Sequence, residues 1–216
     1  MNRKSPITFQ TTDGQTVTVR RMLPADVNQL VYIYRQLSPE SFYQRFREPA
    51  SNLSPMRILE EARALAEAGY NQGAGFLAFV DLPERRGVPI AGARYICIGD
   101  DVAEVAITVC DAFQKRGVGA RLLAILIEEA LRESVRRLVA NVDANNSAVL
   151  QLLNRYTYPQ KREQVGSEIL IEFDISQEGV SHSASTGRKA TGPGPKRRIP
   201  PVHNARIAAF APPYKP

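Results

Sequence analysis

The stretch that decides the fold is Ala103-Glu104-Val105-Ala106-Ile107-Thr108-Val109, followed closely by Gln114-Lys115-Arg116-Gly117-Val118-Gly119-Ala120. The first part predicts a strand over 103–110, and the second is a polar loop that leads directly into an apolar helical segment. Glycines let the backbone approach a ligand closely, and the first N–H groups of a helix attract anions. The stretch therefore predicts a phosphate-binding turn. It has neither the GxxxxGK[ST] spacing of a P-loop nor the GxGxxG spacing of a dinucleotide site.

The segments on either side of this stretch predict its place in a sheet. Gly99-Asp100-Asp101 is typical of a hairpin turn, so the strand expected at Ile90–Ile98 pairs antiparallel with the strand at 103–110. The helix that begins after the loop continues to about Val135, and a strand follows at Leu138–Val142. Because a strand, a crossover helix and a second strand make a parallel pair, these two strands are expected to be parallel neighbours in a mixed sheet.

Strands and helices also alternate over the rest of the chain up to Ile175. The order of these elements indicates an α/β fold whose sheet is mixed, of the α+β type. Further strands are expected at Gln15–Arg21, Phe76–Asp81 and Glu168–Phe173, and helices at Pro24–Leu37, after Ser38-Pro39-Glu40, at Ser54–Ala68 and at Asn146–Arg155. Gly69–Gly75 is expected to be a turn-rich break, and Pro83–Gly87 a charged loop.

The positive charge of the chain lies in its last part. The 216 residues carry a formal net charge of +6, but residues 176–216 hold seven basic side chains against Glu178, so residues 1–175 are neutral. The last part is also rich in Pro, Gly and Ser, and such a segment buries too little apolar surface to offset its ordering entropy. We therefore expect a folded domain over 1–175 and a disordered basic tail over 176–216. The neutral folded domain is not expected to bind nucleic acid, although the tail keeps a nucleic-acid-binding module open as an alternative.

Several kinds of site are excluded by residue type. Both histidines, His182 and His203, lie in the tail, so the folded domain holds no Ser-His-Asp triad, no Cys-His dyad and no histidine zinc site. Cys97 and Cys110 lack CxxC spacing, which argues against a metal site, and they are expected about 20 Å apart along the hairpin, too far for a disulfide. The prediction is two small buried thiols, with a reactive Cys110 as the alternative. The chain has no apolar run of membrane-spanning length and no secretory signal is expected, so we predict a cytoplasmic protein without a membrane partner.

The same residues resemble a known family. The run from Ala103 through Gln114-x-x-Gly117-x-Gly119-Ala120 resembles the acyl-CoA binding motif of the GNAT superfamily of N-acyltransferases, [Q/R]xxGx[G/A] after a central strand. Asn146, which opens a helix after the next strand, matches the family pattern, as does the strand, Pro-Ala-Asp turn and helix over Thr18–Leu30. The resemblance covers Val17–Phe173. It implies a GNAT-like three-layer fold, with a central mixed sheet splayed between two parallel strands and flanked by helices.

The resemblance also implies how acetyl-CoA, the expected cosubstrate, is bound. Its pantetheine arm would lie between the two parallel strands and pair with the backbone of Ile107 and Val109. Asn146 would contact the same arm. The pyrophosphate would be held by N–H groups of the loop and first helical turn, with Lys115, Arg116 or Arg121 adding charge. The loop residues concerned are Gln114, Lys115, Arg116, Gly117, Val118, Gly119 and Ala120.

The resemblance further implies direct attack of an amine on the thioester, for which a base and an acid are needed. Glu104 is the candidate base, because protein-lysine acetyltransferases of this family carry a glutamate at this place; the alternative is an exposed glutamate paired with an arginine such as Arg94. The tyrosine that serves many members as acid is replaced by Leu153, and Tyr156 or Tyr158 could substitute for it.

The predicted function is transfer of an acetyl group from acetyl-CoA to a primary amine such as a protein lysine. Leu37-Ser38-Pro39-Glu40-Ser41-Phe42-Tyr43-Gln44-Arg45-Phe46 resembles a segment of the protein-lysine subgroup. Within it, Arg45 is expected to form a helix-surface ion pair, and contact with the substrate is the alternative. A small-amine acetyltransferase and a degenerate acyl-CoA-binding sensor remain as alternatives. The sequence leaves a homo-oligomer open.

Overall fold

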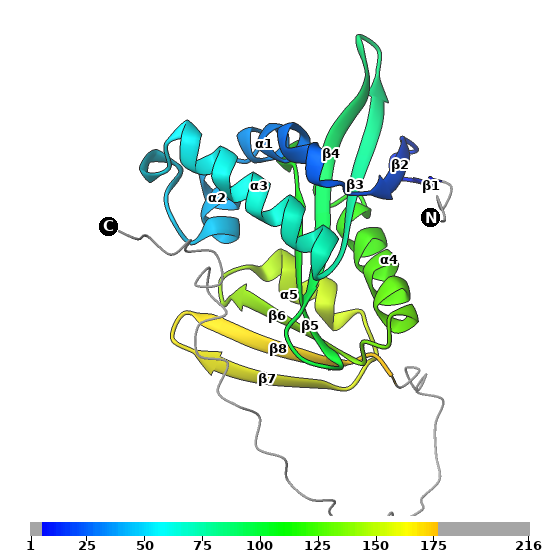
Figure 1. Cartoon of the computed structure of the whole chain (residues 1–216), viewed down its shortest axis with the longest axis vertical. Coiled ribbons are helices and arrows are strands. Elements are labelled where there is room, and N and C mark those ends of the chain that lie inside the picture. Colours follow the sequence, from blue (N-terminus) through cyan, green and yellow to red (C-terminus); the bar gives the residue numbers. More distant parts are fainter. Residues whose placement is uncertain (1–5, 177–216) are drawn as a thin grey trace, which may run out of the picture. The chain divides into compact units, whose positions relative to one another are not determined.

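The chain forms one mixed eight-stranded sheet with helices on both faces (Figure 1). A computed structural model describes residues 6–176. The strands are β1 (Ile7–Gln10), β2 (Thr16–Arg21), β3 (Gly73–Leu82), β4 (Arg85–Cys97), β5 (Val102–Val109), β6 (Arg137–Asp143), β7 (Gln160–Val165) and β8 (Glu168–Asp174), and the α-helices are α1 (Val27–Arg35), α2 (Pro39–Phe46), α3 (Pro55–Asn71), α4 (Val118–Arg132) and α5 (Ser147–Asn154). Their order in the sheet is β1-β2-β3-β4-β5-β6-β8-β7, which confirms the predicted mixed sheet.

The two parallel strands at the centre part soon after they meet. Strands β5 and β6 pair in parallel from Val102 opposite Arg137 to Glu104 opposite Val139. Beyond those positions β5 continues to Val109 and β6 to Asp143. The sheet therefore opens between its two halves directly after Glu104, as the predicted splayed sheet requires.

Each face of the sheet carries its own hydrophobic core. Helices α4 and α5 pack on one face, where Leu122, Leu126 and Leu138 are fully buried. Helices α1, α2 and α3 cover the other face, where Ile33 and Leu77 are fully buried. Figure 1 shows α3 and α4 on opposite sides of strands β3 and β4. Helices, sheet and helices make the three layers expected.

Strand β5 contributes side chains to both faces because successive side chains of a strand alternate. Ala103 and Val105 belong to the core under α4, and Ile107 and Val109 pack against it. Glu104, Ala106 and Thr108 alternate with them and therefore face the α1–α3 layer. The candidate base thus lies on the opposite face of the sheet from helix α4.

Some sequence-based boundaries were wrong. Helix α3 runs to Asn71 and β3 begins at Gly73, so the break expected at Gly69–Gly75 is almost absent. The charged segment near Pro83 is a tight turn, because β3 and β4 both extend into it. Strands β1 and β7 were missed, since both are edge strands whose side chains are largely exposed and carry little apolar periodicity.

The predicted disordered tail lies, apart from Ser176, outside the described residues, so it stays a prediction. Over residues 6–176, no helix is both long and apolar enough to cross a membrane.

Candidate active site

The opening between β5 and β6 is lined by backbone that faces away from β4. In an antiparallel ladder, hydrogen-bonded positions alternate along each strand. The Cys110 N–H donates to the Ile90 carbonyl (2.8 Å), and the Ile98 N–H donates to the Val102 carbonyl (2.9 Å). The backbone groups of the even-numbered residues of β5 therefore hydrogen-bond to β4. The backbone groups of Ile107 and Val109 therefore point toward β6, past the end of the parallel pairing. This geometry suits a ligand that adds itself as a short strand.

The loop after β5 turns sharply at two residues with positive φ. Lys115 has φ 58° and Gly117 has φ 86°, and Gly117 is the N-cap residue of the 15-residue helix α4. The N–H groups of Val118, Gly119 and Ala120 open that helix, where no preceding turn supplies acceptors. Aligned N–H groups and the positive end of the helix dipole make a site for phosphate oxygens.

Contacts from elsewhere in the chain hold this loop. Gln114 Nε2 donates to the Val109 carbonyl (3.1 Å) and to Ser41 Oγ (3.1 Å), and the Gln114 N–H donates to the Asp111 carbonyl. Gln114 therefore braces the loop with its side chain, and its N–H is already used. Arg116 pairs with Asp13 (2.7 Å) in the β1–β2 turn. Of the three predicted basic groups, Arg116 thus carries its own counter-charge.

Asn146 lies at the start of helix α5, which follows β6. Asn146 is the N-cap residue of α5, and its Oδ1 accepts a hydrogen bond from the Val149 N–H (3.1 Å). Gly119 lies between α5 and β5: a Cβ built there would stand 3.7 Å from Leu152 Cδ2 and 3.9 Å from Val109 Cγ2. The first turn of α4, the end of β5 and helix α5 therefore lie side by side.

Glu104 is the last residue of β5 that pairs with β6, and its side chain is half-buried. In the register of β4 and β5, Glu104 lies opposite Ile96, and Arg94 lies opposite Ala106 on the same face. The two charges interact electrostatically, but among residues 6–176 no nitrogen of Arg94 comes within 4.0 Å of a Glu104 oxygen. The alternative of an exposed glutamate in an ion pair with Arg94 is thus not what the structure describes.

The geometry of loop, opening and glutamate agrees with a comparison against known families. The family model described as "Acetyltransferase (GNAT) family" matches residues 32–158, more than half of the chain. The chain belongs to the GNAT family. GNAT enzymes are acyl-CoA-dependent acyltransferases, so the resemblance found in the sequence is confirmed.

Individual relatives agree with this assignment. "Acetyltransferase Pat" of Mycolicibacterium smegmatis is 33% identical over 173 residues, which cover 79% of this chain and 49% of the relative. The GNAT domain of S. lividans PAT has a TM-score of 0.67 at 31% identity, covering 78% of this chain and 96% of that chain. A cAMP-binding acyltransferase from Mycobacterium smegmatis has a TM-score of 0.53 at 28% identity, covering 79% of this chain and 47% of that chain.

This GNAT chain spans about half the length of Acetyltransferase Pat. The relatives named Pat and PAT put it close to the protein-lysine acetyltransferase group that Leu37–Phe46 indicates.

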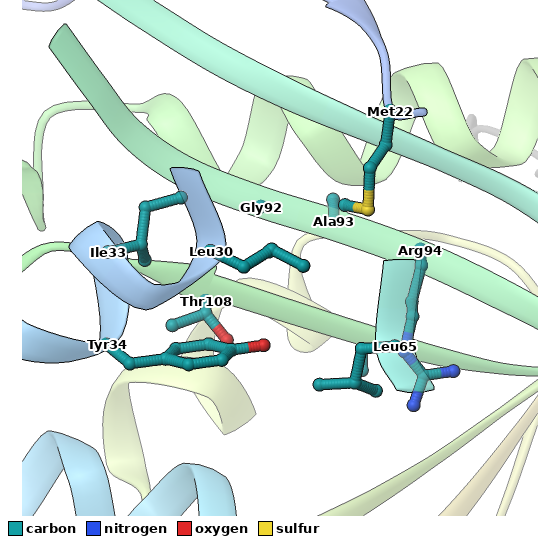
Figure 2. A pocket seen from close by; sticks show the side chains of 10 residues that line it. Met22, Leu30, Ile33, Tyr34, Leu65, Gly92, Ala93, Arg94 and Thr108 are labelled. Atoms are coloured by element: carbon teal, nitrogen blue, oxygen red, sulfur yellow. The ribbon is translucent and has the colours of Figure 1, made fainter. Parts of the chain in front are cut away.

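A small cavity lies on the α1–α3 side of the GNAT sheet (Figure 2). It measures about 20 Å³, and Tyr34, Leu65, Arg94, Ala106 and Thr108 are among the residues that line it. Figure 2 shows the Tyr34 ring extending from α1 toward the side of the cavity along which Arg94 runs down from β4. Sequence reasoning did not identify this cavity, although an arginine between the apolar residues of β4 was a signal for it.

Arg45 differs from its prediction. Its side chain is half-buried, it lies over the Phe46 ring at 5.5 Å and it interacts with the buried Tyr34 hydroxyl. No ion pair of Arg45 occurs among residues 6–176, and its Nε is buried without a hydrogen-bond partner. The predicted surface ion pair is therefore wrong, because α2 turns this face toward the sheet.

The positions considered for a general acid differ in what they contact. Leu153 is buried in the core, and a leucine side chain has no acidic proton that it could donate. Tyr156 donates its hydroxyl hydrogen to the Ala120 carbonyl (2.9 Å) and stacks on Tyr158 at 6.1 Å. Burial and the neighbouring Tyr158 raise the pKa of Tyr156. Tyr156 therefore ties the chain after α5 to the first turn of α4.

Replacing Tyr156 by phenylalanine is expected to reduce stability and to leave turnover unchanged. The variant loses one part-buried hydrogen bond to Ala120, which costs about 1 kcal/mol. Urea denaturation and the release of free thiol from acetyl-CoA check the two parts. A folded variant with a turnover number more than about tenfold lower would contradict the structural role, since general acids contribute on at least that scale.

The two cysteines lie in different environments. Cys110 is buried and its Sγ faces the Ile33 carbonyl (3.9 Å), whereas Cys97 is exposed at the end of β4. Both thiols are free. The predicted burial is confirmed for Cys110 and was wrong for Cys97. Burial raises the pKa of Cys110 to about 12 and also raises that of Cys97 to a lesser degree.

Iodoacetamide at about pH 8 is expected to modify Cys97 of the native protein and to spare Cys110, because only thiolates are nucleophilic. Mass spectrometry of the two tryptic peptides checks this result, and unfolding in guanidinium should make both thiols reactive. Modification of Cys110 at the same rate as Cys97 in the native protein would show that the core around Ile33 opens easily.

Proposed function

We propose that this chain transfers an acetyl group from acetyl-CoA to the side-chain amine of a protein lysine. The observation that carries the proposal is the parting of β5 from β6 directly after the half-buried Glu104. The opening can admit an acyl-CoA from the side of helix α4, and Glu104 faces the opposite layer, from which an acceptor amine can approach. Membership of the GNAT family supports the coenzyme.

In this proposal each part of the site has one task. Val118, Gly119 and Ala120 hold the pyrophosphate by their N–H groups, and Ile107 and Val109 hold the pantetheine arm by their backbone. Glu104 takes a proton from the acceptor ammonium. The amine nitrogen then forms the amide bond with the acetyl carbon while the carbon–sulfur bond breaks. The nitrogen gives up its second proton to solvent, and the CoA thiolate takes a proton from solvent. A thiolate is a good leaving group, so the step does not depend on a tyrosine at position 153.

Two observations favour a lysine acceptor. The relatives named Pat and PAT lie close to the protein-lysine group, and Leu37–Phe46 matches that subgroup and forms the loop and helix α2 on the Glu104 side of the sheet. A degenerate sensor that binds acyl-CoA without turnover is the second candidate, because Leu153 is buried where many members have their acid. A cytoplasmic location is part of the leading proposal.

The test has two stages on the full chain. Calorimetric titration with acetyl-CoA measures binding, and free-thiol release with lysine proteins, lysine peptides and small amines then measures transfer. Acetylated lysine found by mass spectrometry is the expected result. Transfer to small amines alone would replace the lysine acceptor, binding without any transfer would support the sensor, and no binding would refute both functions.

The tail is a separate proposal that the same assay tests. We propose that residues 176–216 form an accessory basic segment, so a chain that ends at Ile175 is expected to bind acetyl-CoA as tightly as the full chain. A gel-shift assay at low and moderate salt, with and without the tail, tests contact with nucleic acid. Loss of acetyl-CoA binding on truncation would contradict this division of the chain.

A further inference from the structure

Two arginine side chains face the acceptor side of the sheet without hydrogen-bond acceptors for several of their N–H groups. Arg94 comes from β4 and Arg45 from α2. Nε and Nη1 of Arg94 and Nε of Arg45 are buried and have no partner among residues 6–176. Buried polar groups in native proteins nearly always have partners, and an exception calls for a missing water or ion. The cavity beside Arg94 has about 20 Å³, enough for one water or one oxygen of a larger group.

Charges around these arginines do not balance. Arg45 and Arg94 repel each other. Burial and the charge of Arg45 lower the pKa of Arg94 to about 10, so Arg94 remains a cation at neutral pH. The acidic groups that act on the cluster of Arg45, Arg94 and Tyr34 are Glu104 and Glu61. Glu61 pairs with Arg57 (3.3 Å), and Glu104 makes no ion pair with Arg94. With Glu61 paired to Arg57, Glu104 is left to balance the two positive charges of Arg45 and Arg94, so the cluster keeps one excess positive charge. An uncompensated buried charge is costly.

The cluster lies beside the candidate base. Arg94 and Glu104 are on adjacent antiparallel strands, on the same face, in diagonal positions. Diagonal neighbours in such a ladder are about 7–8 Å apart between Cα atoms, within reach of long side chains. A molecule whose amine reaches Glu104 can therefore place a second group, a few bonds away, against Arg94. That second group should be an anion with planar acceptors, since guanidinium groups bind carboxylates by parallel N–H donors.

We infer that Arg94 and Arg45 form an anion subsite of the acceptor site, which binds the carboxylate of an acidic residue next to the acceptor lysine in a peptide chain. The inference rests on the proposed lysine acetylation. A peptide is the occupant because the proposed acceptor is a protein lysine. The cavity borders Arg94 and, at about 20 Å³, has room for one carboxylate oxygen.

The test compares pairs of lysine peptides that differ in one residue, glutamate or glutamine, placed one or two positions before or after the lysine. At one position, the glutamate peptide is expected to have a kcat/KM about tenfold higher, mainly through KM, as for one charge-assisted hydrogen bond. Arg94→Gln is expected to abolish this ratio. Arg86→Gln, on the exposed part of the same strand, is the matched control and should keep it. If Arg94→Gln does not fold, Arg45→Gln serves in its place.

The inference is overturned if the kcat/KM of the glutamate peptide equals that of the glutamine peptide at every position. It is also overturned if the preference for glutamate persists in Arg94→Gln. Free lysine and a lysyl-glutamate dipeptide are tested as acceptors in the same assay. A higher kcat/KM for either of them than for the longer glutamate peptides would mean that the acceptor is a small aminocarboxylate, and it would overturn the inference as stated.

A binding measurement separates this inference from the proposed function. With saturating CoA present, acetate is expected to raise the melting temperature of the full chain above that in acetamide at equal ionic strength, and Arg94→Gln should remove the difference. If no lysine peptide is acetylated, the proposed lysine function fails and the melting temperatures alone test the subsite. A difference in melting temperature between acetate and acetamide that disappears in Arg94→Gln would support the anion subsite. Equal melting temperatures in acetate and acetamide would overturn it. If peptides are acetylated without a glutamate preference, the lysine function stands and the subsite fails.

Discussion

Replacing Glu104 by glutamine is expected to lower kcat/KM for a lysine acceptor by about 10²–10⁴-fold, the usual contribution of a positioned general base. Glutamine keeps the size and hydrogen-bonding atoms of the side chain but cannot take the proton of the ammonium. Glu104 is half-buried at the last paired position of β5, so the substitution leaves the sheet and the acyl-CoA opening in place. Free-thiol release between about pH 6 and 9 measures the effect, and calorimetric titration shows that acetyl-CoA still binds.

The pH profile distinguishes lost catalysis from lost folding. Without an internal base, the rate should follow the small fraction of neutral lysine, whose amine has a pKa of about 10.4, and rise about tenfold per pH unit. The wild-type rate should rise less steeply over the same range. Glu163→Gln, on the exposed strand β7, is the matched control and should behave as the wild type. Unchanged turnover in Glu104→Gln over this range would refute the role of base.

Replacing Gly73 by alanine is expected to destabilise the protein by more than about 2 kcal/mol, among the larger effects of a single substitution. A Cβ at this position would stand 2.1 Å from the Tyr95 carbonyl oxygen and 2.9 Å from its carbon, which are backbone atoms of the neighbouring strand β4. The pair of strands must therefore move apart at the start of β3. Tyr95 is almost fully buried, so the movement also disturbs the core under α4.

Urea denaturation of the purified variant checks this loss, with midpoint and slope analysed together. Gly99→Ala is the control, because a Cβ there meets Val102 Cβ at 3.8 Å, an ordinary contact. A Gly73→Ala protein with wild-type stability would mean that β3 and β4 are not packed as described. Equal losses in both variants would show that the cost comes from glycine replacement in general.

The sequence predicted the parts of the fold that have strong local patterns. The hairpin turn at Gly99-Asp100-Asp101, the alternating strand after it and the apolar helix α4 were recognised nearly to their ends. Edge strands β1 and β7 were missed because exposed strands lack the apolar alternation that reveals a strand. The start of β3 was missed because Gly73 and Gly75 favour a turn locally, whereas the close approach to Tyr95 selects glycine in a strand.

For the site residues too, conformations set by a strong local pattern could be predicted, and contacts with distant residues could not. Gly117 and Gly119 indicated a phosphate loop, and Gly117 does have the left-handed conformation that glycine adopts readily. The pairing of Arg116 with Asp13 was not predictable, because the two residues are 103 positions apart and Asp13 belongs to the turn after a missed strand. Arg45 was misplaced for a related reason: the orientation of α2 is set by packing of Phe42 and Phe46 against α1.

The sequence by itself determined the family, the order of elements and the loop that precedes α4, because these depend on local propensities and on a short pattern of residues. Only the tertiary structure decided where β5 leaves β6, which face Glu104 occupies, and that Arg94 and Arg45 face the same side without sufficient counter-charge. Those features arise from contacts between residues far apart in the chain. Their energies depend on distance and burial in the folded protein, which no local pattern of residues encodes.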